Sequence, residues 1–234
     1  MKKILLCSVD LPKSTVRIFN DLQYDAVFVP KCRFLSPAVA SHPDILFSVI
    51  GERQILTDCN YLKENEAFFQ TLAEKGVEIT ACKQRLSEKY PCDVLFDAIK
   101  TDKLLVGNLK YTAPELFVGS AKAVNVKQGY ALCSTLLMEN AAVCADKGIC
   151  SVLSENGYNV LQITPGDILL EGCDYGFIGG ASAVLEDIKT VVFFGNVREH
   201  RDGEKIISFC RENGYVVCFD ESLPLTDYGS VKVI

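Results

Sequence analysis

A five-residue motif recurs along this chain and constrains its fold more than any other feature. The motif reads PDILF at 43–47, CDVLF at 92–96, CDYGF at 173–177 and TDYGS at 226–230, with a degenerate copy, YALCS, at 130–134. Counted at its second position, the copies start at residues 44, 93, 131, 174 and 227. Self-similarity at this spacing predicts one supersecondary unit per copy, each packed against its neighbours.

The hydrophobic pattern between copies predicts one order of elements: strand, strand, helix, strand. After Asp44, apolar runs predict strands over 45–50 and 54–57, helical spacing predicts a helix over 65–75, and a third strand covers 77–80. The copy at 93 predicts strands over 94–99, 104–108 and 123–126, with a helix within 114–120. The copy at 131 predicts strands over 132–138, 141–144 and 158–163, with a helix within 149–153. The copy at 174 predicts strands over 175–185, 190–195 and 215–219, with a helix within 204–211.

The two ends of the chain complete one another in this scheme. The copy at 227 has only the strand 228–234, and the N-terminus supplies a strand at 3–8, a helix at 13–22 and a strand at 26–29. We therefore predict an α/β protein in which five units close into a ring with both termini in one unit, because closure removes exposed sheet edges. We expect a single domain over 1–234, with units at approximately 226–234 plus 1–32, 42–83, 91–127, 129–166 and 172–222.

Composition narrows the classes of partner. The 234-residue chain has a formal net charge of −6, which argues against nucleic acid and membrane surfaces as partners. No apolar run reaches the length of a membrane span, and residues 1–8 predict a strand and not a signal peptide. The eleven cysteines lie mostly inside apolar runs without a Cys-x-x-Cys pair, so we expect reduced thiols in a cytoplasmic protein without metal or cofactor.

A ring of five such units resembles the pentein fold, the five-bladed α/β-propeller. That superfamily includes guanidino-modifying enzymes, among them arginine deiminase, agmatine deiminase and amidinotransferases, and a ribosome anti-association factor that is not a catalyst. The stretch LLEGCDYGF at 169–177 looks like the family's Leu-[Asp/Glu]-Gly-Gly-Asp-hydrophobic pattern. The stretch GYALCST at 129–135 is similar to the one that carries the general-base histidine, but Leu132 stands at the histidine position. The family's nucleophilic cysteine falls within LTDYGSVK at 225–232, which contains no cysteine.

The resemblance implies that the first strand of each unit lines a central channel. Side chains alternate along a strand, so residues two apart share a face. This register predicts a common face for four carboxylates and one thiol, namely Asp44, Asp93, Asp174, Asp227 and Cys133. Crowded carboxylates favour a bound cation, and they are the candidate ligands for an amine or a guanidinium. The alternative of comparable weight is that each aspartate caps a turn.

Catalysis in such a channel would use Cys133 as the nucleophile, with His42 or His200 as its base. The competing interpretations are that Cys133 is an inert core residue, that His42 belongs to a turn before Pro43, and that His200 lies in a solvated loop.

Three functions follow from these alternatives. The first is a protein that binds a small cationic ligand in an acidic channel, with amidinohydrolase or amidinotransferase chemistry if Cys133 reacts. The second is a non-catalytic interaction module, and the third is an unrelated α/β enzyme built on one parallel sheet. The sequence leaves the ligand and the oligomeric state open.

Overall fold

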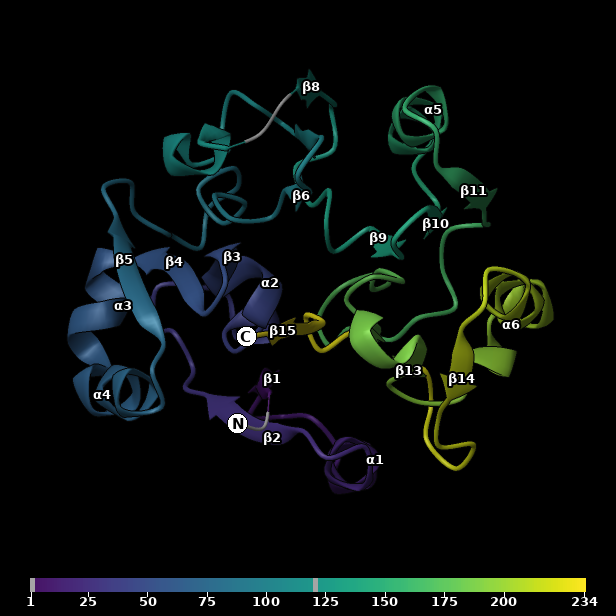
Figure 1. The fold of residues 1–234 in the computed structure, drawn as a ribbon, viewed down its shortest axis with the longest axis horizontal. Helices are drawn as coiled ribbons and strands as arrows, with labels where there is room; N and C mark the ends of the chain where they lie inside the picture. The colour runs from purple at the N-terminus through teal and green to yellow at the C-terminus, as the bar shows by residue number, and fades with distance from the viewer. Residues whose placement is uncertain (1–2, 120–121) are drawn as a thin grey trace.

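Five small sheets follow one another around a ring (Figure 1). The structure is a computed structural model that describes residues 3–119 and 122–234. Each sheet has three strands, in the orders β15-β1-β2, β3-β4-β5, β6-β7-β8, β9-β10-β11 and β12-β13-β14. In every sheet the first strand is antiparallel to the second, and the second is parallel to the third. This topology confirms the predicted five-bladed α/β-propeller, and it differs from the single parallel sheet of the third alternative.

The blade after the first motif contains the most regular elements. It comprises α2 (Pro43–Leu46), β3 (Phe47–Gly51), β4 (Gln54–Asp58), α3 (Cys59–Glu64), α4 (Glu66–Glu74) and β5 (Glu78–Cys82). Asp58 fixes the start of α3, because its Oδ1 accepts the N–H groups of Asn60 at 2.7 Å and Tyr61 at 2.8 Å. Phe47, Tyr61 and Phe69 then meet edge to face at 5.8–6.2 Å, and so hold both helices on the sheet.

The other blades repeat this order with shorter elements. The second blade contains β6 (Ile99–Lys100), β7 (Leu105–Gly107), η2 (Pro114–Phe117) and β8 (Ala123–Asn125). The third blade contains β9 (Thr135–Leu137), β10 (Ala141–Cys144), α5 (Lys147–Glu155) and β11 (Asn159–Gln162). The fourth blade contains β12 (Ser182–Leu185), η3 (Glu186–Ile188), β13 (Thr190–Phe193), η4 (Val197–Glu199), α6 (Gly203–Glu212) and β14 (Val216–Cys218). The helix predicted within 114–120 is one 3-10 turn, and Ser120 lies outside the described residues.

The fifth blade joins the two ends of the chain. It comprises β1 (Ile4–Ser8), α1 (Lys13–Asp21) and β2 (Asp25–Val29) from the N-terminal part and β15 (Val231–Val233) from the C-terminal part; a further 3-10 turn, η1 (Pro37–Val39), leads into the next blade. β15 pairs with β1 in antiparallel register, with Leu6 opposite Lys232. The shared terminal blade is therefore confirmed. Met1 and Lys2 lie outside the described residues, and the extent of the domain over 1–234 remains a prediction.

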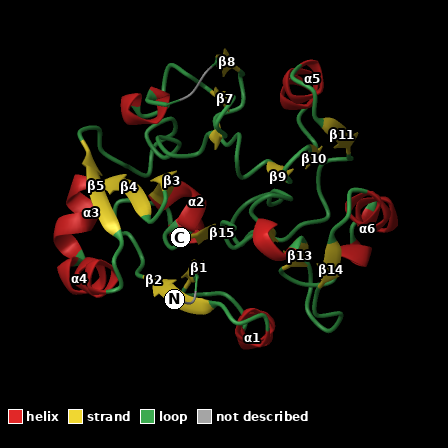
Figure 2. Ribbon diagram, viewed as in Figure 1, coloured by secondary structure: helices red, strands yellow, loops and turns green. Residues whose placement is uncertain are grey.

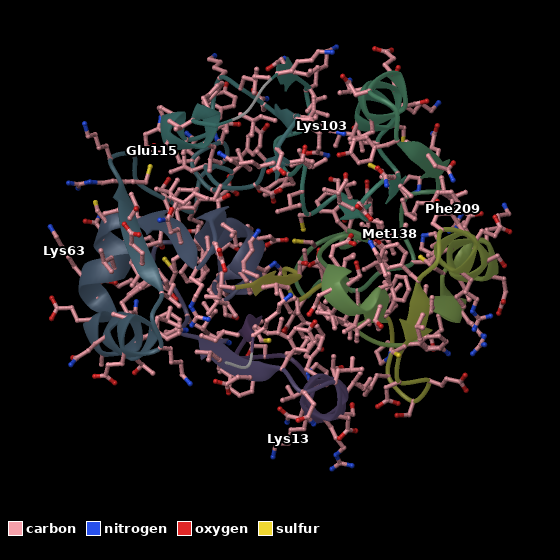
Figure 3. All side chains as sticks on the ribbon, viewed as in Figure 1. Lys13, Lys63, Lys103, Glu115, Met138 and Phe209 are labelled. Carbon is pink, nitrogen blue, oxygen red and sulfur yellow. The ribbon has the colours of Figure 1, made fainter. Side chains whose placement is uncertain are left out.

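The first strand of each blade faces the axis of the ring, and the helices α1, α3, α4, α5 and α6 lie on the rim (Figure 2). Contacts between neighbouring first strands follow this arrangement, since β9 meets β12, β12 meets β15, and β15 meets β3. Charged side chains such as Lys13 and Lys63 point outward from the rim helices (Figure 3). In the part of the chain that the structure describes, every helix is too short or too polar to cross a lipid bilayer.

The first strands are shorter than predicted, and this changes their register. The prediction over 45–50 places a strand where the chain first forms the helical turn α2, because Pro43 occupies the first turn and His42 C=O accepts the N–H groups of Ile45 and Leu46. The strands predicted from 94, 132, 175 and 228 likewise begin only at 99, 135, 182 and 231. Turns before each inner strand therefore carry the residues that reach the axis.

Candidate functional site

Turns that precede the five inner strands meet at one end of the ring. Five residues lie two to four positions before these strands, namely Asp44, Asp97, Cys133, Gly180 and Asp227. Backbone hydrogen bonds join the turns: Asp44 N–H donates to Gly229 C=O at 3.0 Å, and Gly180 N–H donates to Cys133 C=O at 2.9 Å. Four side chains and one glycine therefore gather at the axis.

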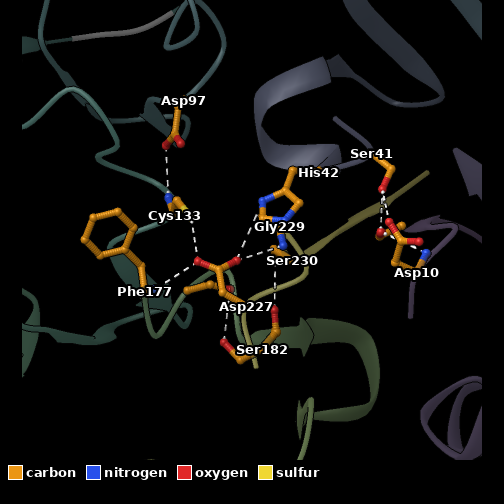
Figure 4. A network of polar contacts seen from close by, with 12 residues as sticks. Asp10, Ser41, His42, Asp97, Cys133, Phe177, Ser182, Asp227, Gly229 and Ser230 are labelled. Atoms are coloured by element: carbon orange, nitrogen blue, oxygen red, sulfur yellow. Dashed lines mark hydrogen bonds and ion pairs between the residues drawn. The ribbon is translucent and has the colours of Figure 1, made fainter. Parts of the chain in front are cut away.

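Asp227 is buried at this point, and Figure 4 shows its carboxylate in contact with Cys133, Phe177 and His42. Its Oδ2 accepts the Phe177 N–H at 2.8 Å and the Cys133 thiol at 3.5 Å, and its Oδ1 accepts the Gly229 N–H at 2.9 Å. His42 Nδ1 lies 3.8 Å from the same Oδ1. Burial raises the pKa of Asp227 to about 6, although the two N–H donors and the thiol oppose this. Burial lowers the pKa of His42, which favours the neutral imidazole.

Glycine at position 180 makes room for the Asp227 carboxylate. A Cβ at Gly180 would lie 2.5 Å from Asp227 Cγ and 2.7 Å from its Oδ2, closer than real Cβ contacts. The fourth blade thus has no side chain at its axial position, and the Asp227 carboxylate from the neighbouring blade occupies that volume.

A second group of side chains lies beside Asp227. Asp44, Asp97 and Cys133 each offer a ligand atom within 4.8 Å of the others. Asp97 Oδ1 accepts the N–H groups of Leu132 at 2.7 Å and Cys133 at 2.9 Å. Burial raises the pKa of Asp44 and raises that of Asp97 well above its ordinary value. Burial and the nearby carboxylates likewise raise the pKa of the Cys133 thiol, so it is protonated at neutral pH.

Lys232, on β15, is the charge that faces this group. Its side chain is almost completely buried, at 7% exposure. Burial lowers the pKa of Lys232, whereas Asp44, Asp97 and Cys133 raise it. The ammonium therefore compensates part of the negative charge that these groups carry when ionised.

A cavity of about 640 Å³ lies against Asp227, whose side chain has no solvent-exposed area of its own. His42 and Asp227 belong to its lining together with the charged Asp10, Lys31 and Glu171. Lys31 Nζ pairs with Asp10 Oδ2 at 2.9 Å, so the Glu171 carboxylate and Asp227 carry the remaining charge of the lining. The cavity wall is therefore acidic.

Sequence reasoning assigned some of these residues to the axis, and the structure brings four of them together: Asp44, Asp227, Cys133 and His42. It places three others elsewhere. Asp93 accepts a hydrogen bond from the Tyr130 hydroxyl, and Asp174 is exposed in a turn. His200 is held by Thr164 C=O at 3.1 Å and by the Asp202 N–H at 3.0 Å, at the end of η4.

Asp97 and Lys232 are the residues that sequence reasoning missed. Asp97 follows Asp93 by four residues, and the late start of β6 moves the axis-facing position from one to the other. The signal for Asp97 is a carboxylate that lies two residues before the start of its strand, and this signal could be used only if the late start of β6 were known. For Lys232, the signal is weaker, because a lysine in a short terminal strand usually lies at the surface.

Comparison with protein families gives a match over almost the whole chain. The sequence model of DUF6873, described as a family of unknown function, matches residues 6–232. The chain belongs to this family. A comparison with curated protein sequences gave no significant match for this DUF6873 member.

Solved structures share the fold of this DUF6873 protein at low sequence identity. An amidinotransferase of the saxitoxin biosynthetic pathway from Microseira wollei superposes with a TM-score of 0.57 at 11% identity, covering 93% of this chain and 88% of that chain. A dimethylarginine dimethylaminohydrolase solved as an adduct with S-methyl-L-thiocitrulline gives 0.58 at 11% identity, covering 94% and 92%. A variant of the Pseudomonas aeruginosa enzyme complexed with citrulline gives 0.55 at 10% identity, covering 94% and 92%. These similarities confirm that the DUF6873 chain has the pentein fold.

Proposed function

We propose that this protein binds a small cationic ligand, an amine or a guanidinium, in the cavity above Asp227. The observation that carries the proposal is a buried carboxylate at the inner end of an acidic cavity. Asp10, Glu171 and Asp227 give three carboxylates in the lining against the single ammonium of Lys31. A desolvated carboxylate is stabilised by an incoming cation, and a guanidinium can donate two parallel hydrogen bonds to it.

Structures of proteins with the same fold support the proposal of a small ligand. Two of the similar structures are dimethylarginine dimethylaminohydrolases solved with citrulline or as an adduct with S-methyl-L-thiocitrulline. A cavity of about 640 Å³ is within the range of small-molecule sites. In this proposal Asp227 is the ligand-binding carboxylate, His42 orients the ligand as a neutral imidazole, and Asp44 contributes long-range charge. Asp93 and Asp174 lie outside the proposed site.

Chemistry at Cys133 is the less favoured part of the same proposal. A nucleophilic thiol needs a base or cation that lowers its pKa. The Cys133 thiol instead donates to Asp227, and burial and the surrounding carboxylates raise its pKa. Both ring nitrogens of His200 are engaged, by Thr164 C=O and by the Asp202 N–H. We therefore propose binding as the function, with amidinohydrolase or amidinotransferase activity as the outcome to be tested by product analysis.

Thermal-shift measurements with matched ligands test the binding. Arginine and agmatine carry a guanidinium, and citrulline has nearly the shape of arginine with an uncharged ureido group. At a ligand concentration of 100 Kd, binding stabilises the native state by about 2.7 kcal/mol. For a chain of this length that shift corresponds to about 5–11 °C in Tm. We expect a shift with the cations and none with citrulline.

Two variants make this test specific. Asp227→Asn keeps the side-chain shape and removes the charge, so it should abolish the shift. Asp174→Asn is the matched control, since Asp174 is exposed outside the cavity and its variant should bind as the wild type does. Equal shifts for the wild type and Asp227→Asn, or no shift with any cation at millimolar concentration, would refute the proposal. Conversion of a ligand that Cys133→Ser abolishes would assign the nucleophile to Cys133.

A non-catalytic interaction module is the second candidate, and a run of aromatic rings favours it. Tyr111, Tyr90, Tyr130, Phe177 and Tyr175 contact one another in this order, with centroids 6.0–6.4 Å apart. Two of these rings are well exposed, Tyr90 at 48% and Tyr175 at 43%. Exposed aromatic groups of this kind are typical of binding surfaces. The candidate predicts a bound partner whose affinity falls in Tyr90→Ala while the response to cations is unchanged.

A further inference from the structure

Polar atoms without partners are concentrated beside Asp227. His42 Nδ1, both carboxylate oxygens of Asp44 and Asp97 Oδ2 are buried and lack a hydrogen-bond partner. The three side chains belong to residues that are at most 4% exposed. Buried polar groups in native proteins are almost always satisfied, and a cluster of exceptions indicates an ion or ligand at that place. Four such atoms at one end of the axis are therefore the strongest unexplained feature of the molecule.

We propose that Asp44, Asp97 and Cys133 bind a divalent transition-metal ion. One ligand atom from each lies within 4.8 Å of the other two, and the unpartnered oxygens of both carboxylates belong to this group. Ligand atoms around a tetrahedral zinc ion are about 3.3–3.8 Å apart, given bonds of about 2.0–2.3 Å. Side-chain movements of about 1 Å would therefore bring the three groups onto one ion.

The local charge favours a doubly charged ion. With the Cys133 thiol protonated, Asp44, Asp97 and Asp227 contribute three negative charges when ionised and Lys232 contributes one positive charge, which gives a net charge of −2. A divalent cation that displaces the thiol proton and binds the thiolate leaves a net charge of −1. Lys232 acts on the carboxylates through its field, and both Asp44 oxygens stay without a hydrogen bond.

The donor atoms select the kind of metal. A thiolate with two carboxylates suits Zn²⁺, Co²⁺ or Fe²⁺, whereas Mg²⁺ and Ca²⁺ prefer sites made of oxygen alone. His42 Nδ1 is the fourth of the unpartnered atoms named above; it lies outside the group whose ligand atoms are within 4.8 Å of one another, so His42 would have to move toward the ion to become a fourth ligand. His42 also lines the cavity.

This inference revises the expectation of a protein without metal. That expectation came from the absence of a Cys-x-x-Cys pair and from the wide spacing of the histidines. In the structure the three ligands come from three different blades, so no local spacing in the sequence marks the site. The ring closure that brings the inner strands together is what assembles the ligands.

Cobalt spectroscopy on the full chain tests the site. The protein is stripped with EDTA and titrated with Co²⁺, and Zn²⁺ is then added as a competitor. We expect one equivalent of Co²⁺ to bind with a near-ultraviolet sulfur-to-cobalt charge-transfer band, and we expect Zn²⁺ to displace it. Elemental analysis after dialysis should give one Zn²⁺ per chain, and Zn²⁺ but not Mg²⁺ should raise the Tm of the wild type.

Matched cysteine variants identify the ligand. Cys133→Ser is nearly isosteric and should lose the charge-transfer band, with affinity lowered by more than about 10-fold, the loss that even an outer-shell partner of a metal can cause. Cys144→Ser is the control, because Cys144 is equally buried but lies on β10 outside the group. A wild-type chain that binds neither metal at 1 mM would overturn the inference. The same holds if Cys133→Ser keeps the band. The cation-binding test runs in EDTA, so its result is independent of this one.

Discussion

Gly180→Ala tests whether the Asp227 carboxylate occupies the axis of the ring. An ideal Cβ at this position would lie 2.5 Å from Asp227 Cγ, and real Cβ contacts are almost never below 3.0 Å. The nearest atom, Asp227 Oδ1, would lie only 2.1 Å away, so the carboxylate would have to move by about 0.9 Å or more. This movement would disturb the hydrogen bonds that it accepts from the N–H groups of Phe177 at 2.8 Å and Gly229 at 2.9 Å. Overpacking of this kind costs about 1–3 kcal/mol. For a chain of this length we expect a decrease in Tm of about 2–12 °C.

The decisive measurement is the same substitution in an Asp227→Ala background. The three atoms nearest to the added methyl group all belong to the Asp227 carboxyl group, and Asp227→Ala removes them. Gly180 has no positive φ, so alanine is compatible with its backbone and should even stabilise slightly by restricting the unfolded chain. We therefore expect Gly180→Ala to leave the free energy of unfolding unchanged in the Asp227→Ala background. The difference from its effect in the wild type gives a coupling energy of about 1–3 kcal/mol between the two positions.

Gly176→Ala provides the matched control. Its added Cβ would lie 2.5 Å from Asp227 Cβ, an atom that alanine at 227 retains. The cost of Gly176→Ala should accordingly persist in both backgrounds. Urea unfolding followed by circular dichroism suits this chain, which contains no tryptophan. An equal cost of Gly180→Ala with and without the Asp227 carboxylate would refute the placement of that group at the axis.

Two further predictions concern single titratable groups. Burial raises the pKa of the Cys133 thiol, so iodoacetamide at neutral pH should label the exposed Cys173 at least about tenfold faster, as peptide mass spectrometry would show; equal rates would contradict this. The Lys205 ammonium and the Thr164 N–H hold the pKa of Asp202 below its ordinary value. Their contribution to the free energy of unfolding is therefore fully present above the unfolded-state pKa of about 3.9, and it is lost as pH falls through the native pKa. Asp202→Asn should therefore lower Tm at pH 7, and the difference from the wild type should shrink as the pH falls below about 3.9; a difference that grows on acidification would contradict this.

The fold could be predicted because the ring is built from local patterns. Apolar runs and glycine stops mark the strands and helices of each blade, and the missing strands at one end of the chain are the spare ones at the other. The pairing of β1 with β15 follows from that complementarity, since an unclosed ring would leave two sheet edges unpaired. The order of elements was therefore enough to predict the fold, although the chain does not match the catalytic cysteine and histidine positions of the family that it resembles.

The register of the site could not be predicted in the same way. Each motif begins with an acid followed by apolar residues, and alternation then suggests a strand that starts at the acid. At Pro43 the chain instead forms a helical turn, and the turns before β6 and β12 delay those strands in a similar manner. The strand predicted from 94 begins five residues later, and Asp97, four residues after Asp93, lies at the axis in its place. Such delays depend on hydrogen bonds between blades, as between Asp97 and Cys133 N–H, which no local pattern reveals.

The differences among the five motif copies have a physical reason. A closed ring brings five equivalent positions to one axis, and five carboxylates there would strongly raise one another's pKa values. The chain places aspartates at only three of these positions, Asp44, Asp97 and Asp227, and it adds Lys232 from β15. Gly180 supplies the volume that Asp227 occupies, and Cys133 supplies a neutral thiol that donates to it. The site therefore departs from the repeat at two positions, Gly180 and Cys133, and only Cys133 adds a reactive side chain. We expect the chemistry of this protein to depend on Cys133.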